Sequence, residues 1–98
     1  MNTYIPNKEI NEWVEENREV IFSDIVEAID GVVSGKDAFP AIVCKIRTHT
    51  GVLDFLVNED NVLDSLKKAE MWFVVEEKYE KAAKARDLQK IYTKKQAV

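Results

Sequence analysis

The sequence has little of the residue types on which catalytic and metal-binding sites depend. Its 98 residues include one cysteine, one histidine and three glycines. A single cysteine cannot form an internal disulfide. The chain has no Cys-x-x-C spacing, no Asp-x-Asp-x-Asp-Gly calcium loop and no glycine-rich phosphate loop. We therefore expect a protein that is not an enzyme and that holds neither a metal ion nor a cofactor.

Long apolar runs are also missing. No segment approaches the roughly 18 apolar residues that a membrane-spanning helix needs, and the N-terminal MNTYIPNKE has neither the basic nor the apolar region of a secretory signal. The lone cysteine suits a reducing compartment. These features predict a cytoplasmic protein without membrane contact, in which residues 1–98 form one domain with its own core.

The two most reactive side chains stand in unpromising surroundings. His49 lies between two threonines in an expected turn, and nothing in the sequence indicates an orienting partner or a pocket for it. Cys44 falls on the apolar face of an expected strand, where a thiol packs as a small hydrophobic group. We interpret His49 as an incidental turn residue and Cys44 as a buried, unreactive thiol.

Charge is distributed unevenly along the chain. The formal net charge is −4, yet residues 1–77 carry −9 and residues 78–98 carry +5. The simplest interpretation places the basic segment 78–95 against the acidic N-terminal helical region, within one chain or between two copies. Contact with an acidic protein or with a nucleic acid is the alternative, with Tyr79 or Tyr92 stacking on bases. The residues expected to contact nucleic acid are Lys81, Lys84, Arg86 and Lys90.

Residues 6–34 carry apolar side chains at three- and four-residue spacing, which predicts helix. Asn17 interrupts this stripe and Ser23 is a suitable N-cap, so we favour two helices over one, with the break within 17–23. Gly35 is the expected terminator, and residues 36–40 the connecting loop. The stripe consists of Ile10, Trp13, Val14, Ile21, Ile25, Ala28, Ile29 and Val32.

Residues 41–57 alternate with a period of two, which predicts a central β-hairpin. Its connection is either a two-residue turn at His49–Thr50 or a four-residue loop that extends through Val52. Both place Lys45 and Asp54 on the outer face, beside Arg47, where they can form a cross-strand ion pair. The expected inner face consists of Ile42, Cys44, Ile46, Leu53, Phe55 and Val57.

Residues 60–95 predict one long C-terminal helix, because no glycine or proline interrupts them. Such a helix would measure about 54 Å at 1.5 Å per residue and would extend beyond a domain of this size. Its exposed part needs a second surface, so we expect a homodimer. The residues expected at this interface are Trp72, Tyr79, Leu88 and Tyr92.

The five consecutive apolar residues 71–75 leave one alternative open. In a helix their side chains point in all directions, so the segment would be buried on every side. As a short third strand, the same segment would instead break the long helix and stabilise the hairpin. We favour the helix, because no turn residue flanks the segment.

Together these patterns predict an α+β protein with an N-terminal helical segment, a central hairpin and a C-terminal helix. Without a catalytic motif, its function is expected to lie in its surfaces, as a small protein-interaction or regulatory accessory module that binds itself and an unidentified protein. One alternative is binding of RNA or single-stranded nucleic acid through the basic segment. Another is inhibition of a host or partner protein by a factor encoded by a phage or mobile element.

Overall fold

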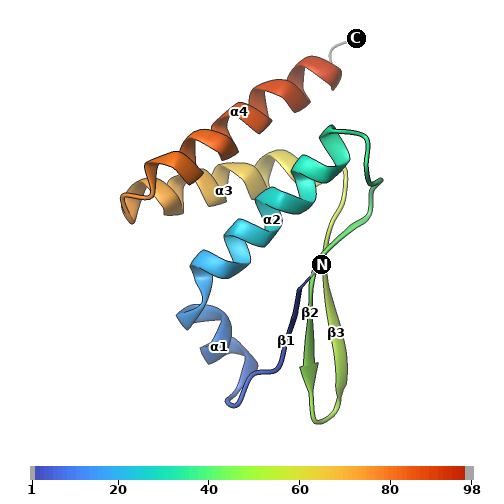
Figure 1. Ribbon diagram of the computed structural model, residues 1–98, viewed down its shortest axis with the longest axis vertical. Coiled ribbons are helices and arrows are strands. Elements are labelled where there is room, and N and C mark those ends of the chain that lie inside the picture. Colours follow the sequence, from blue (N-terminus) through green and yellow to red (C-terminus); the bar gives the residue numbers. More distant parts are fainter. Residues whose placement is uncertain (1, 97–98) are drawn as a thin grey trace.

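The fold belongs to the expected α+β class. In the computed structural model, which describes residues 2–96, the helices lie on one side of one small sheet (Figure 1). The prediction of helix, hairpin and C-terminal helix in that order is confirmed. The elements are β1 (Asn2–Tyr4), α1 (Ile10–Glu16), α2 (Arg18–Val33), β2 (Ala41–Thr48), β3 (Gly51–Val57), α3 (Val62–Val75) and α4 (Tyr79–Gln96).

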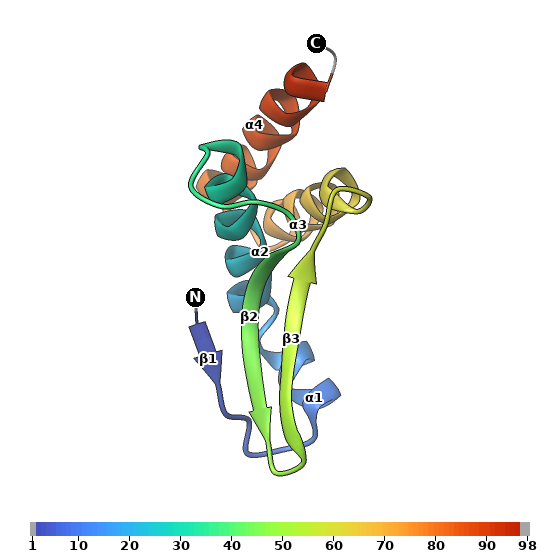
Figure 2. The same cartoon turned by 90° about the vertical axis from the view of Figure 1, so that its right-hand side faces the viewer.

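The long helix α2 lies at the centre of three layers. One side of α2 packs on the sheet, mainly on β2, and its other side contacts the pair formed by α3 and α4 (Figure 1). This position explains why α2 buries Ile21, Val26 and Ile29, which do not share one narrow stripe. The far face of the sheet is turned toward the viewer in Figure 2, and no helix of residues 2–96 covers it.

The first helical region consists of two helices, as favoured, but the break lies at Asn17 and Ser23 is inside α2. The side-chain amide of Asn17 donates a 2.8 Å hydrogen bond to the carbonyl of Trp13, so it satisfies a carbonyl of the last turn of α1. At the far end of α2, Gly35 has a φ of +86°, a conformation that glycine adopts readily. The helical region therefore ends where expected.

The hairpin has the two-residue turn at His49–Thr50, since Thr48 pairs with Gly51. Lys45 and Asp54 are opposite each other, and their ion pair is confirmed at 3.7 Å.

The expected inner face of the hairpin is partly wrong. A β-bulge between Ile42 and Cys44 makes Val43 an extra residue, so Val43 is buried and Ile42 pairs with Leu56 on the outer face. Leu53 is on the inner face as predicted, opposite the buried Ile46, although it is 49% exposed.

The third strand of the sheet comes from the N-terminus. Residues 71–75 are helical, as favoured, so the alternative that made them a strand is wrong. The expectation that this helical segment is buried on every side is also wrong, because Met71, Val74 and Val75 are exposed. Instead β1 pairs with β2 in parallel, with Thr3 opposite Lys45, and the sheet order is β1-β2-β3. A third strand gives the hairpin the support that an isolated two-stranded unit lacks.

The C-terminal helical region is not one long helix. It breaks at residues 76–78 without glycine or proline, because Glu77 takes a left-handed conformation with φ of +60°. The amide of Lys78 donates to the carbonyl of Phe73 at 2.7 Å, and that of Glu77 to the carbonyl of Val74 at 3.0 Å. These two bonds form a Schellman cap, which ends α3 and lets α4 fold back.

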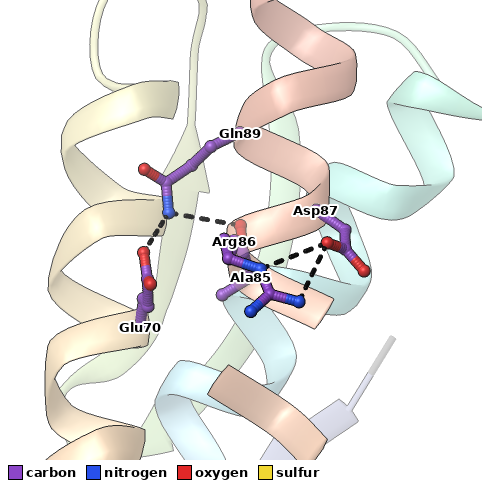
Figure 3. Close-up of polar contacts among 5 residues, drawn as sticks. All are labelled: Glu70, Ala85, Arg86, Asp87 and Gln89. Atoms are coloured by element: carbon purple, nitrogen blue, oxygen red, sulfur yellow. Dashed lines mark hydrogen bonds and ion pairs between the residues drawn. The ribbon is translucent and has the colours of Figure 1, made fainter. Parts of the chain in front are cut away.

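As a result, the apolar stripe of α4 packs against its own chain. Ala82 and Ala85 are buried near the turn, where small side chains let two helices approach closely. Gln89 joins the two helices further along through a 2.7 Å bond to the carboxylate of Glu70, and it also donates a 3.3 Å bond to the carbonyl of Ala85 within α4 (Figure 3). The described chain therefore has no extended C-terminal helix along which two copies would pair, and dimerisation stays a prediction.

Candidate protein-binding surfaces

Exposed apolar side chains gather where α3 turns into α4. Four of them form a cluster that we call the apolar tip: Met71 is 69% exposed, Val74 47%, Val75 74% and Tyr79 62%. Residues three and four apart on a helix are neighbours, so Met71, Val74 and Val75 share one face of α3. Tyr79 follows directly after the turn. A contiguous exposed apolar patch of this kind is typical of a binding surface.

The tip is exposed because the opposite side of α3 forms the core. Phe73 is fully buried among the side chains of α2, with its ring centroid 6.3 Å from that of Phe22. This contact fixes how α3 is rotated about its axis, so the side chains of Met71, Val74 and Val75 point outward. Lys67 and Lys68 lie one turn before the patch, and Glu76 and Glu77 follow it. The tip is therefore an apolar surface with a charged rim.

The four side chains expected at an interface separate into two groups. Tyr79 belongs to the apolar tip, and Trp72 is half-buried beside it, with its ring 5.7 Å from that of Phe22. Leu88 and Tyr92 instead lie in the core, at 4% and 8% exposure. They present no surface to a partner in the folded chain, because α3 and α4 are folded back on each other.

Two of the four residues expected to contact nucleic acid form ion pairs with α2. The ammonium group of Lys81 lies 2.8 Å from the carboxylate of Glu19, and that of Lys84 lies 3.4 Å from Asp30. The hydrogen bond from Lys81 is the main reason why the pKa of Glu19 lies below its usual value. The interpretation that the basic segment lies against the acidic helix is thus confirmed, within one chain.

The other two predicted contact residues lie farther along α4. Arg86 pairs with the adjacent carboxylate of Asp87 at 3.3 Å (Figure 3). Lys90 is exposed and forms no ion pair with residues 2–96. Three of the four predicted contact residues, Lys81, Lys84 and Arg86, are therefore partly neutralised by carboxylates.

The two most reactive side chains, Cys44 and His49, lie in different surroundings. Cys44 is buried as expected, and burial raises the pKa of its thiol to about 11, which disfavours the reactive thiolate. His49 is exposed at the hairpin turn. Within the described part of the chain, no three His, Cys, Asp or Glu side chains are grouped so that they could hold a metal ion. No described helix is long and apolar enough to cross a bilayer.

Sequence reasoning missed two features near the sheet. One is the buried Asp24, which accepts hydrogen bonds from Tyr4 and Asn2 of β1. Its position three residues after Ile21 puts a carboxylate beside the apolar stripe, and that signal could have indicated a polar partner. The other is the open edge of β3, which the alternating pattern of the hairpin did not indicate.

Comparisons with known proteins give no functional information. No family model, no curated protein and no solved structure matches this chain.

Proposed function

We propose that this chain is a small protein-interaction module that binds a partner protein through the apolar tip. The observation that carries the proposal is the exposure of Met71, Val74 and Val75 on one face of α3, together with that of Tyr79 directly after the α3–α4 turn. Leaving such a cluster in water is unfavourable, by about 25 cal/mol per Å² of apolar surface. A partner that covers it would recover this free energy.

The geometry of the tip favours a partner with an apolar groove. Met71, Val74 and Val75 follow the spacing by which an amphipathic helix inserts into such a groove. The fully buried Phe73 and the Schellman cap hold this end of α3 in place before binding. A surface that is already ordered loses little conformational entropy on binding, which favours affinity.

The proposed action is that of an accessory factor and not of an enzyme. By occupying the surface of a partner, such a module regulates or inhibits that partner. The alternative of an inhibitor of a host or partner protein is thus one form of the proposed function. We place the protein in the cytoplasm, because a lone buried thiol suits a reducing compartment. Self-association can accompany this activity, but it would need a surface other than the stripe that contains Leu88.

Nucleic-acid binding is the alternative proposal, and the arrangement of charges favours it less. Lys81 and Lys84 face carboxylates of α2, so a phosphate would have to displace Glu19 and Asp30. The net charge of −4 also opposes the approach of a polyanion.

Site-specific photo-crosslinking tests the proposal. A benzophenone amino acid in place of Val75 reports what contacts the tip in cells of the source organism, and the same group in place of Asn11 is the control. Asn11 is exposed on α1, outside the apolar tip. We expect a protein adduct from position 75 that position 11 does not give, and we expect Met71→Lys to abolish it.

Salt separates the two proposals. Apolar docking changes little between about 50 and 200 mM salt, whereas phosphate binding weakens steeply over this range. An adduct from position 75 that persists at the higher salt supports docking through the tip. The proposal is wrong if positions 75 and 11 give the same adducts or none, or if the purified complex contains nucleic acid that is released by salt.

A further inference from the structure

The strand β3 has one unpaired edge. It pairs with β2 on one side and has no strand on the other side within residues 2–96 (Figure 2). Its sequence, Gly-Val-Leu-Asp-Phe-Leu-Val, contains one charge, that of Asp54, and no proline. Proteins usually protect such an edge with several charges, a proline or a covering element. An unprotected edge of seven residues is a template for an added strand.

The register shows which backbone groups point to this open side. The two-residue turn makes Thr48 and Gly51 the hydrogen-bonded closing pair of the hairpin. Because hydrogen-bonded and non-bonded pairs alternate along an antiparallel ladder, Val52, Asp54 and Leu56 direct their amide and carbonyl groups away from β2. The side chains of these three residues share the outer face of the sheet, and all are exposed.

A cavity lies on the helical side of the sheet, at the hairpin-turn end of β3. The N-terminal part of α1 lies one layer behind β3 (Figures 1 and 2). Pro6 and Ile10 line a cavity of about 370 Å³ together with Val52 and Leu53. Lys8, Glu9 and His49 also line this cavity, so a strand added beside Gly51–Leu53 would contact the sheet through its backbone and a partly polar cavity through its inward side chains.

We propose that the β3 edge, defined as Gly51–Val57, binds an extended peptide segment of another protein as a fourth strand. The charge on the edge specifies the chemistry of that segment. Asp54 has Lys45 on one side at 3.7 Å, and its other side faces the open edge. The residue placed opposite Asp54 should therefore be Lys or Arg, and the residues opposite Val52 and Leu56 should be apolar.

A single strand fits this edge better than a second copy of the chain does. In a dimer with a two-fold axis beside β3, the α1 helix of the second copy would lie behind the two paired β3 strands. The α1 helix of the first copy already lies there (Figure 2). A second copy would also meet like charge at the centre, because the full overlap of two β3 strands places Asp54 opposite Asp54. The β3 edge is separate from the apolar tip, so this inference goes beyond the proposed function.

Binding of short synthetic peptides tests the inference. The probe is acetyl-Thr-Val-Thr-Lys-Thr-Val-Thr-amide, and the control peptide has Glu in place of Lys. Backbone amide shifts of the isotope-labelled full chain report the site and the affinity. We expect shifts along Gly51–Val57 and about five-fold tighter binding of the Lys peptide, the size that a favourable against an unfavourable cross-strand charge pair gives. In the Asp54→Lys variant, the preference should reverse to the Glu peptide.

Two N-methylated peptides provide a matched control for the backbone pairing. Methylation of the Val and Lys amides, which would face β3, should abolish binding, and methylation of the Thr amides, which would face away, should preserve it. The inference is overturned if both methylated peptides bind alike, if Asp54→Lys does not change the preference, or if no shifts occur along β3. It is also overturned if light scattering shows a dimer that Asp54→Lys dissociates. Val75→Glu alters the apolar tip only and should leave peptide binding unchanged, so the two proposals can fail separately.

Discussion

The hydroxyl group of Tyr4 donates a 2.6 Å hydrogen bond to the carboxylate of Asp24. This contact joins the first strand to the central helix, and the side-chain amide of Asn2 adds a second bond to Asp24 at 3.0 Å. Asp24 is 7% exposed, so its carboxylate has little access to water and depends on these donors. The short strand β1 is thus anchored by polar contacts in addition to its pairing with β2.

Tyr4→Phe should destabilise the fold by about 1–3 kcal/mol, because it leaves a buried carboxylate with one donor fewer. Thr3→Val is the matched control, since Thr3 is exposed on the same strand. It should change the free energy of unfolding by less than about 0.5 kcal/mol. Urea denaturation followed by circular dichroism measures both. Equal stability of Tyr4→Phe and the unmodified chain would show that the hydrogen bond to Asp24 does not hold β1 in place.

Stability should fall as the pH rises above about 9. Burial, as the main cause, raises the pKa of Tyr4 from 10.0 to about 12 and that of Cys44 from 9.0 to about 11. Between these pKa values the unfolded chain releases its protons and the folded chain keeps them, so rising pH stabilises the unfolded state relative to the folded state. The melting temperature between pH 8 and pH 11.5 measures the effect. The melting temperature of Cys44→Ala should fall less steeply over pH 9–11. A melting temperature of the unmodified chain that stays constant up to pH 11.5 would contradict the prediction.

The elements that the sequence predicted correctly are those determined by local pattern. Apolar spacing indicated the helices on both sides of the hairpin, and alternation indicated the hairpin with its Lys45–Asp54 pair. The bulge at Val43 was not predictable, because two consecutive residues face the core only where α2 covers them. The parallel strand β1 depends on Asp24, which is distant in sequence, so no local pattern could indicate it.

For the candidate surfaces, the sequence indicated only some of the side chains that the structure exposes. The sequence indicated Tyr79 and the neighbourhood of Trp72, which lie at or beside the apolar tip. It misplaced Leu88 and Tyr92, because the turn that buries them depends on a left-handed Glu77 and not on a glycine or proline. Non-glycine residues rarely adopt this conformation, so the sequence pattern predicts that the helix continues through Glu77.

Glu77→Gly should stabilise the protein by about 0.5–1 kcal/mol. A left-handed conformation strains any residue with a Cβ, and glycine adopts it without this cost. The control is Glu76→Gly, at a position with φ of −87°, where glycine only adds flexibility to the unfolded chain. We expect a higher melting temperature for Glu77→Gly and a lower one for Glu76→Gly. A lower value for both would mean that the Glu77 side chain contributes more than its strain costs.

Leu88→Asp tests whether the apolar stripe of α4 is buried within one chain or binds a second copy. Leu88 is 4% exposed, so the substitution removes apolar packing and buries an unpaired carboxylate, at a cost of about 3–5 kcal/mol. Ile91→Asp is the control, since Ile91 lies on the same helix but is 43% exposed. We expect Leu88→Asp to lose most of the cooperative thermal transition and Ile91→Asp to keep it. If light scattering instead showed that Leu88→Asp is a fully folded monomer while the unmodified chain is a dimer, α4 would bind a second copy through this stripe, and the burial of Leu88 within one chain would be wrong.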